Sequence, residues 1–304
     1  MTEKTQEKTR EKIEGKSTLS PRLAPGLYVT ATPIGNARDI TLRALDVLSR
    51  ADLVLCEDTR VTAKLFAIHG IAAKTAPYHD HNAAEMRPRV LRRLEAGEAI
   101  ALVSDAGTPL VSDPGLKLVR EALDAGHNVT ALPGASSVLA ALTLAGLPTD
   151  RFFFAGFLPA RQEARRKELA ELAVIPATLV FLESANRLEA VLADMAAALG
   201  SREVSVAREL TKKFEEVRRG TLGDLAAHYA EAGAPKGEIV IVVGPPEKRA
   251  ALCAHEVDAM IENALQRALV LADTFLPGWR ATVDGAPARL DAVTLITELK
   301  DVLG

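Results

Sequence analysis

The chain has 304 residues, enough for about two domains of ordinary size. Hydrophobic residues make up 48% of it, while a formal net charge of −3 provides no overall attraction to nucleic acid, so any such contact needs a local basic patch. Its two cysteines lie far apart without metal-ligand spacing, which argues against a disulfide-built or zinc-built protein.

The N-terminal segment, residues 1–25, alternates acidic and basic side chains and lacks the apolar core of a secretory signal. This composition is typical of a disordered tail. No apolar run in the chain approaches the roughly 20 residues that span a bilayer. The sequence therefore predicts a cytoplasmic protein with no membrane contact.

From residue 26 onward, apolar runs alternate with segments of helical periodicity. Strands are expected at 27–34, 52–56, 99–103 and 127–132, with a further short one near 75–78. Such alternation favours a parallel or mostly parallel sheet with crossover helices. The sequence thus predicts an N-terminal α/β domain over residues 26–148.

One loop of this domain, residues 102–115 (LVSDAGTPLVSDPG), combines acidic residues, glycines and prolines directly after a buried strand. The carboxyl ends of strands in an open α/β sheet form ligand crevices. Asp113 and Pro114 are interpreted as the start of the next helix, at the N-cap and first helical positions. Asp105 precedes that helix and has no capping role, so it is the candidate for ligand contact.

Two common nucleotide fingerprints are missing. No G-x-G-x-x-G follows the first strand, and no G-x-x-x-x-G-K-[ST] occurs in the chain. The polar run His79, Asp80 and His81 is interpreted as a loop that lines a cleft, and no metal site is expected. Glu57 and Asp58 follow the second strand, where they can act as a base or bind an amine, or where Asp58 or Thr59 can cap a helix.

Residues 149–246 are expected to form a second, α+β domain with a mixed sheet. The predicted strands are an aromatic one from 152 and others at 178–182, 203–207 and 238–243, with fewer helices between them. The boundary between the two domains is expected near residues 147–151. Residues 247–304 are expected to be a helical tail of uncertain packing, whose last part, 271–304, is atypical.

The second domain carries two basic groups, either solvated surface or a cleft that grips RNA phosphates. The candidate RNA-binding residues are Arg161, Arg165, Arg166, Lys167, Arg208, Lys212 and Lys213.

Nine motifs in order resemble one family. They are TPIGN (32–36), CEDTR (56–60), HDHN (79–82), LVSDAGTPLVSDPG (102–115), LPGASS (132–137), GLPTDRFFFAGFLP (146–159), FLESANR (181–187), ARELTKKFE (207–215) and KGEIVIVVG (236–244). Together they resemble the tetrapyrrole-methylase superfamily of class III methyltransferases, and within it the enzymes that act on small-subunit ribosomal RNA. The resemblance covers about residues 26–244.

The resemblance implies two α/β domains of the tetrapyrrole-methylase type with S-adenosylmethionine in the cleft between them, and a homodimer. It also implies 2′-O-methylation of a cytidine ribose in small-subunit (16S) ribosomal RNA, free or assembled into the small subunit. The cofactor-contacting positions that it implies are Pro33, Ser104, Asp105, Ala106, Gly107, Thr108, Ser136, Ser137, Phe157, Ala207, Gly237 and Glu238.

A ribose hydroxyl is a poor nucleophile at neutral pH, so a nearby base or cation helps its attack. The candidates are Glu57, Asp58, Arg60 and His81, because their loops are expected to rim one crevice. Asn186 stands where a histidine is common in the family, which weakens any role for it as a base. Two alternatives stay open: a methyltransferase acting on a tetrapyrrole or other small molecule, and a non-catalytic RNA- or ribosome-binding protein on the same fold.

Overall fold

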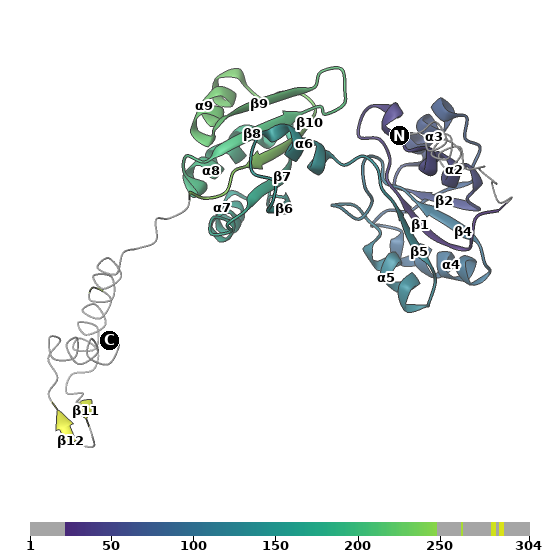
Figure 1. Cartoon of the computed structure of the whole chain (residues 1–304), viewed down its shortest axis with the longest axis horizontal. Coiled ribbons are helices and arrows are strands. Elements are labelled where there is room, and N and C mark those ends of the chain that lie inside the picture. Colours follow the sequence, from purple (N-terminus) through teal and green to yellow (C-terminus); the bar gives the residue numbers. More distant parts are fainter. Residues whose placement is uncertain (1–21, 248–262, 264–280, 284–285, 289–304) are drawn as a thin grey trace, which may run out of the picture. The chain divides into compact units, whose positions relative to one another are not determined.

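The first sheet is wholly parallel, as the sequence predicts (Figure 1). The computed structural model describes residues 22–247, residue 263, and residues 281–283 and 286–288, and it divides into two units, 1–246 and 247–304. The sheet has the order β3-β2-β4-β1-β5, with strands β1 (Gly26–Thr30), β2 (Leu53–Cys56), β3 (Thr75–Pro77), β4 (Ala99–Leu102) and β5 (Val129–Leu132).

Helices connect these parallel strands: α2 (Leu42–Arg50), α3 (Thr59–His69), α4 (Ala83–Glu95) and α5 (Leu116–Asp124), with the short 3-10 helix η1 (Ala37–Asp39). Strands β2 and β4 are buried along their whole length, because helices cover both faces of the sheet. Since the strands run the same way, the loops after their carboxyl ends gather at one edge. That edge carries the loop of residues 103–115.

Asp113 does not start a helix, which corrects the expectation. Helix α5 begins three residues later at Leu116, with Gly115 as its N-cap and no side-chain capping bond. Gly115 has φ +134°, and a Cβ there would meet Leu102 Cδ2 at 2.8 Å, so the chain needs glycine at this crossing. Asp113 and Pro114 therefore belong to the loop, and the Asp113 carboxylate does not cap α5.

The second sheet is mixed, again as predicted. Its order is β6-β7-β10-β8-β9, and only β6 and β7 pair in parallel. The strands are β6 (Phe152–Phe157), β7 (Thr178–Ser184), β8 (Glu203–Arg208), β9 (Glu216–Thr221) and β10 (Glu238–Val243).

The structure adds a strand to those expected in this second part. Strand β9 was not predicted, because its sequence EVRRGT is dominated by polar and charged residues; it lies at the sheet edge, where charged side chains are common. Helices also separate most of these strands, and only β8 and β9 follow each other without one. The helices are α7 (Gln162–Leu172), α8 (Leu188–Leu199), with the 3-10 turn η2 (Ala185–Arg187) before it, and α9 (Leu222–Ala232).

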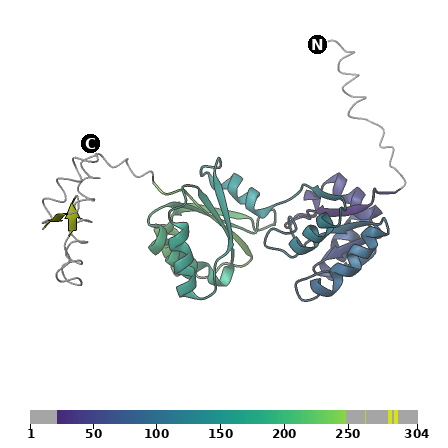
Figure 2. The same ribbon diagram turned by 90° about the horizontal axis from the view of Figure 1, so that it is seen from below.

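Helix α6 (Ser137–Ala145) packs against this second sheet, although it precedes the expected boundary near residue 148 (Figure 1). Alternate residues of β10 show the two faces: Val240 and Val242 pack with α6, while Ile239 and Ile241 pack with α7, α8 and α9. Figure 2 shows the same ribbon turned by 90°. The division of residues 26–246 into two domains stays a prediction, but packing assigns α6 to the second sheet.

The expected helical tail contains a β-hairpin. In the second unit, β11 (Ala281–Val283) pairs antiparallel with β12 (Ala286–Ala288). The rest of residues 248–304, apart from residue 263, and the tail of residues 1–21 lie outside the described residues. Within the part of the chain that the structure describes, no helix has the length and apolarity needed to cross a membrane.

Candidate functional site

A cavity of about 710 Å³ opens between the loops of both sheets in the first unit. The first sheet contributes Ile34 and the loop residues 105–108 and 111–113. The second contributes Phe157 at the end of β6, residues 182–186 from the end of β7 into the turn that follows it, Ala207 near the end of β8, and residues 235–240. This volume is within the range of small-molecule and cofactor sites.

The loop after β4 is held rigidly at this cavity. Thr32 and Gly107 exchange two backbone hydrogen bonds of 2.8 and 3.0 Å, which join the loops after β1 and β4. The buried Ser104 hydroxyl donates to the carbonyls of Ala106 and Gly107. Gly107 has φ +81°, a conformation that side chains with a Cβ rarely adopt. The loop therefore presents a preformed edge of backbone groups to a ligand.

Asp105 links two of the strand-end loops. Its Oδ1 accepts a hydrogen bond of 2.9 Å from the backbone nitrogen of Asp58. This bond joins the loop after β4 to the loop after β2. The sequence predicts that Asp105 contacts a ligand, and Asp105 lies on the cavity wall.

Most of the positions assigned to a cofactor by resemblance line this cavity: Asp105, Ala106, Gly107, Thr108, Ser136, Ser137, Phe157, Ala207, Gly237 and Glu238. Pro33 and Ser104 instead line a smaller cavity of about 290 Å³ beside it. Sequence reasoning missed Val111, Ser112, Asp113 and residues 183–186 as lining residues. The motif FLESANR, which follows a predicted strand, was the available signal for residues 183–186.

The carboxylates of Glu57 and Asp113 both have a raised pKa, and the charge of Asp105 acts on each of them. Burial raises the pKa of Glu57, and the charges of Asp105, Asp113 and Asp80 raise it further, while His79 opposes them. Burial also raises the pKa of Asp113, against a hydrogen bond from Ser104 and with help from the charge of Asp105. A carboxylate with a raised pKa holds a proton more readily, as a general base must.

Asp58 and Arg60 are engaged with each other. The Asp58 carboxylate accepts from the side chain of Arg60 at 2.6 Å and from its backbone nitrogen at 2.8 Å, which caps α3 and lowers the pKa of Asp58 to about 2. The capping interpretation of Asp58 is therefore confirmed, and so low a pKa makes it a poor base. His81 is exposed, with its ring 5.9 Å from that of His79. Among the described residues, no three potential ligands are grouped to hold a metal ion.

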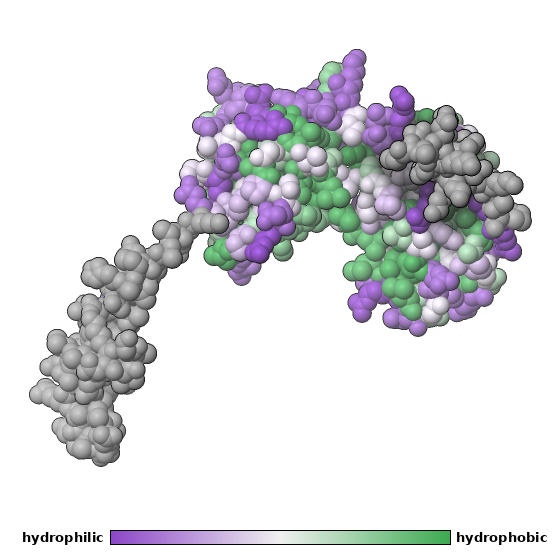
Figure 3. All heavy atoms as spheres, in the orientation of Figure 1, coloured by the Kyte–Doolittle hydropathy of each residue, from purple (hydrophilic) through white to green (hydrophobic). Residues whose placement is uncertain are grey.

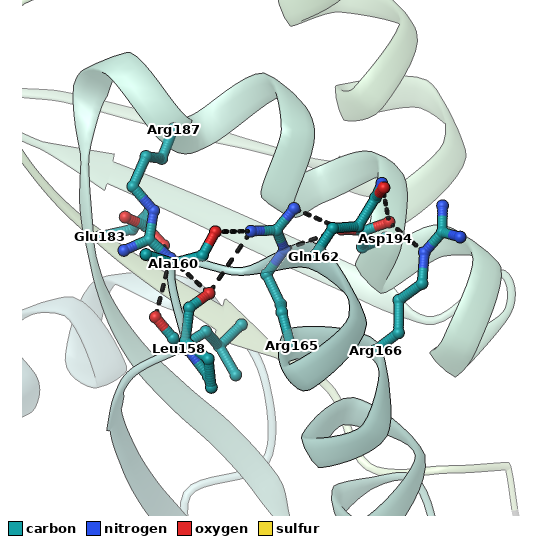
Figure 4. Close-up of polar contacts among 9 residues, drawn as sticks. Leu158, Ala160, Gln162, Arg165, Arg166, Glu183, Arg187 and Asp194 are labelled. Carbon is teal, nitrogen blue, oxygen red and sulfur yellow. Dashed lines mark hydrogen bonds and ion pairs between the residues drawn. The ribbon is translucent and has the colours of Figure 1, made fainter.

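Arg165 is buried in an ion pair, contrary to its expected place on a phosphate-binding surface (Figure 4). Its side chain is 5% exposed, and its Nε and Nη2 lie 2.7 and 2.6 Å from Asp194 Oδ2. Its Nη1 donates to the carbonyls of Pro159 and Ala160, in the loop between β6 and α7. Arg165 thus fastens this loop, and we remove it from the RNA-binding candidates.

Asp194 is the acceptor at the centre of this cluster. It also accepts from Arg166 Nε at 2.7 Å and from Gln162 at 3.1 Å. Burial opposes ionisation of Asp194, but the hydrogen bonds from Arg166, Arg165 and Gln162 outweigh it, so the pKa of Asp194 is lowered. Arg187 holds the same loop from the other side, donating to the carbonyls of Leu158 and Pro159 (Figure 4).

The remaining basic candidates differ in availability. Arg208 pairs with Glu216, and Lys212 pairs with Glu209 and Glu238. Arg166 keeps a side chain 58% exposed despite its pairing. The other exposed cations are Arg161, Lys167 and Lys213. Of the seven candidate RNA-binding residues, these four have exposed side chains.

A parallel five-stranded sheet followed by a mixed one, with a cavity lined by loops of both, is the fold of known methylases. A cobalt precorrin-4 methyltransferase of cobalamin biosynthesis superposes with a TM-score of 0.55 at 22% identity, over 72% of this chain and 94% of that one. The uroporphyrin-III C-methyltransferase of Thermus thermophilus gives 0.53 at 23%, over 72% and 94%. Identities this low establish the fold alone.

The family follows from the sequence comparison. The model of the tetrapyrrole (corrin/porphyrin) methylases matches residues 26–226, and the chain belongs to this family. It is 56% identical to the ribosomal RNA small subunit methyltransferase I of Mesorhizobium japonicum, over 75% of this chain and 78% of that protein. It is 43% identical to the protein of the same name from Escherichia coli O157:H7, over 79% and 93%.

Proposed function

We propose that this chain transfers a methyl group from S-adenosylmethionine to the ribose 2′-oxygen of a cytidine in small-subunit (16S) ribosomal RNA. The observation that carries the proposal is the 710 Å³ cavity, whose walls are formed by the motifs that the chain shares with such enzymes. Relatives named as ribosomal RNA small subunit methyltransferases, at 43–56% identity, favour RNA over a tetrapyrrole as the substrate.

The cavity suits this donor. Ala106, Gly107, Ala207 and Gly237 bring small side chains or bare backbone to its wall, which lets a flat adenosine approach closely. The carboxylate of Asp105 matches a ligand that carries a sulfonium and an ammonium group. A uroporphyrin-III C-methyltransferase structure that contains S-adenosylhomocysteine, at a TM-score of 0.51 and 22% identity, supports the same class of ligand.

In the proposed step, the ribose 2′-oxygen attacks the methyl carbon in line with the carbon–sulfur bond. That bond breaks with its electron pair going to sulfur, which leaves neutral S-adenosylhomocysteine, and the hydroxyl proton passes to a base. Positioning of donor and acceptor supplies most of the rate in such a displacement. Of the four candidates from the sequence, we choose Glu57 as the base, because its pKa is raised by burial and by the charge of Asp105 on the cavity wall, whereas Asp58 and Arg60 pair with each other and His81 is exposed.

Glu57→Gln is expected to lower single-turnover methyl transfer by roughly 10²–10⁴-fold, the usual contribution of a general base. In the wild type, the rate should rise with pH as Glu57 ionises, and this rise should lie above the range of an ordinary glutamate because its pKa is raised. The measurement is a pH–rate profile with donor and RNA saturating. The rise should vanish in the variant.

Glu57→Gln should reduce methyl transfer without destabilising the fold. Because the native state raises the pKa of Glu57, its ionised form destabilises the fold, and that cost appears as pH rises through the native pKa. Glu57→Gln should therefore unfold no more easily than the wild type at neutral pH. The exposed Glu95→Gln on α4 is the matched control. An unchanged profile in Glu57→Gln would exclude this residue as the base.

The exposed cations around α7 are proposed to contact RNA phosphates. We expect Arg161→Gln combined with Lys167→Gln to weaken binding of small subunits and to reduce the slope of log affinity against log salt by about 2, one for each lost phosphate contact. Both side chains are exposed, and neither forms an ion pair in the structure's described part. The control pair, Lys117→Gln with Arg120→Gln on the exposed side of α5, should leave the slope unaltered.

The test of the proposed function is transfer of labelled methyl to purified small subunits and to protein-free 16S RNA, followed by location of the modified nucleotide. Calorimetry with S-adenosylmethionine accompanies it. Donor binding without transfer to either RNA would favour a small-molecule methyltransferase, and no donor binding would favour a non-catalytic RNA-binding protein. A cytoplasmic location next to ribosome assembly belongs to the same proposal.

A homodimer is part of the proposal as well. Phe152 and Phe153 are 43% and 42% exposed on edge strand β6. Hydrophobic surface is visible on the half of the unit that carries β6–β10 (Figure 3). Exposed apolar patches on an edge strand commonly mark an interface between copies.

A further inference from the structure

A second cavity, of about 290 Å³, adjoins the larger one. Ile34, Asp105, Ala106 and Glu238 line both of them, so the start of the loop after β4 forms the shared wall. A ligand in the second cavity would therefore lie directly beside a donor bound in the first. Pro33 and Ser104 are the two positions assigned to the cofactor by resemblance that line the second cavity and not the first.

One side of the second cavity is apolar. Helix α3 contributes Val61, Leu65 and Ile68, whose spacing places them on one helix face. Phe66 packs into the core from another side of α3, so this stripe is not needed to anchor the helix. Ile68 is 65% exposed. Exposed aliphatic side chains that line a hollow are typical of a binding groove.

The polar side of the cavity has an acidic balance. The Lys212 ammonium lies 2.8 Å from Glu209 Oε1 and 2.9 Å from Glu238 Oε2, so two carboxylates already neutralise it. Asp105 adds a further carboxylate to the wall. Such a site repels a phosphate, while its hydroxyl and carboxylate oxygens can accept hydrogen bonds from a neutral ligand.

The volume restricts the ligand further. At about 290 Å³ the cavity lies at the lower end of small-molecule sites. It has room for one sugar and one base, and it is too small for a tetrapyrrole ring or a stretch of RNA helix.

We propose that the second cavity is the acceptor site, which takes a single nucleoside of the RNA turned out of its strand. Enzymes that modify one nucleotide commonly extrude it into such a pocket. The base lies against the stripe of Val61, Leu65 and Ile68, and the ribose lies at the wall of Asp105 and Ala106 that faces the donor. The flanking phosphates stay outside, at the exposed cations. This inference rests on the proposed function and adds the location of its acceptor.

The test is to fill the second cavity without touching the first. Leu65 lines only the second cavity, so Leu65→Trp should leave the affinity for S-adenosylmethionine unchanged in calorimetry. Methyl transfer to small subunits under single turnover should fall by about a hundredfold, the loss that a misplacement of roughly 1 Å already produces. The salt slope of subunit binding should not change, because the phosphate contacts lie elsewhere.

Two further variants test whether the loss comes from filling the cavity and not from the size of the new side chain or from unfolding. Ala67→Trp places the same side chain on the same helix, at an exposed position outside the cavity, and should transfer methyl like the wild type. If Leu65→Trp unfolds at a lower temperature, Ile68→Trp replaces it, because that position is largely exposed and tolerates a larger side chain.

Transfer that is unchanged in the filled variants, or a parallel loss of donor affinity, would overturn the proposal. If the wild type itself transfers no methyl group to subunits, the proposed function has failed and the cavity is judged separately. In that case cytidine is titrated into the protein loaded with S-adenosylhomocysteine. Binding that Leu65→Trp abolishes supports a nucleoside site, whereas no binding, or binding that the variant leaves intact, refutes it.

Discussion

Gly107→Val is expected to reduce S-adenosylmethionine binding at least about tenfold, equivalent to about 1.4 kcal/mol. Gly107 has φ +81° and sits in the paired bridge with Thr32. A Cβ there would lie 3.4 Å from Ile34 Cγ2 and 3.9 Å from the Ala135 carbonyl oxygen. A β-branched residue at positive φ costs about 1–3 kcal/mol, so the loop must move, and with it the cavity edge.

A matched variant, Gly126→Val, separates the effect of backbone strain on stability from the effect of moving the cavity edge on donor binding. Gly126, in the turn before β5, has nearly the same φ of +78°, a Cβ there would meet nothing within 4 Å, and the residue lies outside the cavity. Gly126→Val should therefore lower the unfolding temperature to a similar degree while donor binding, measured by calorimetry, stays intact. Equal donor affinity in Gly107→Val and the wild type would contradict the assignment of this loop to the donor site.

Asp194→Ala is expected to lower the free energy of unfolding by about 3–5 kcal/mol, because it leaves the buried charge of Arg165 without a partner. Asp194 is 1% exposed and Arg165 5%. The loss should be measured by chemical denaturation at neutral pH. Its size is a large fraction of the stability of an ordinary domain.

The control for this prediction is a partly exposed pair on the helix surface. Asp46→Ala removes the partner that Arg50 meets at 2.8 Å on α2, where both side chains are partly solvated, and should cost only about 0.3–0.5 kcal/mol. Replacing both buried partners, as Asp194→Leu with Arg165→Met, should recover much of the loss, because no charge is then left buried. A double variant as unstable as Asp194→Ala would contradict this explanation.

Acidification should lower the free energy of unfolding more in the wild type than in Asp194→Ala. The native state lowers the pKa of Asp194, so its contribution is present above the pKa of the unfolded chain and is lost as pH falls through the native one. The wild type should lose this stability on acidification. The difference between wild type and Asp194→Ala should shrink in step.

The sequence was sufficient for the strands of both sheets that are apolar. Runs such as 99–103 and 238–243 bury both faces, which leaves a continuous apolar signal. Strand β9 has no such signal because, at the sheet edge, only part of it is buried, and its arginines face ion-pair partners and solvent. The hairpin of β11 and β12 was missed within a segment expected to be helical.

Candidate residues separate in the same way. Asp105 was singled out because its loop chemistry is local, and it lines both cavities, while its role in ligand contact stays a prediction. Asp113 was misplaced because a proline and a glycine after an aspartate also describe a helix start. Arg165 was misassigned because its neighbours along the chain are exposed, while its partner Asp194 is 29 residues away.

By itself, then, the sequence indicated the properties that depend on near neighbours: the order of the apolar strands and the helices between them, Asp58 as one of two candidate caps of α3, and the acidic, glycine-containing loop after β4. Its motifs also indicated the family that the comparison established. Only the tertiary structure decided which sheet α6 packs against, which cations keep access to solvent, and that two cavities share one wall. The physical reason is that burial and ion pairing depend on side chains that folding brings together from distant positions in the chain. The local sequence pattern does not identify those distant partners.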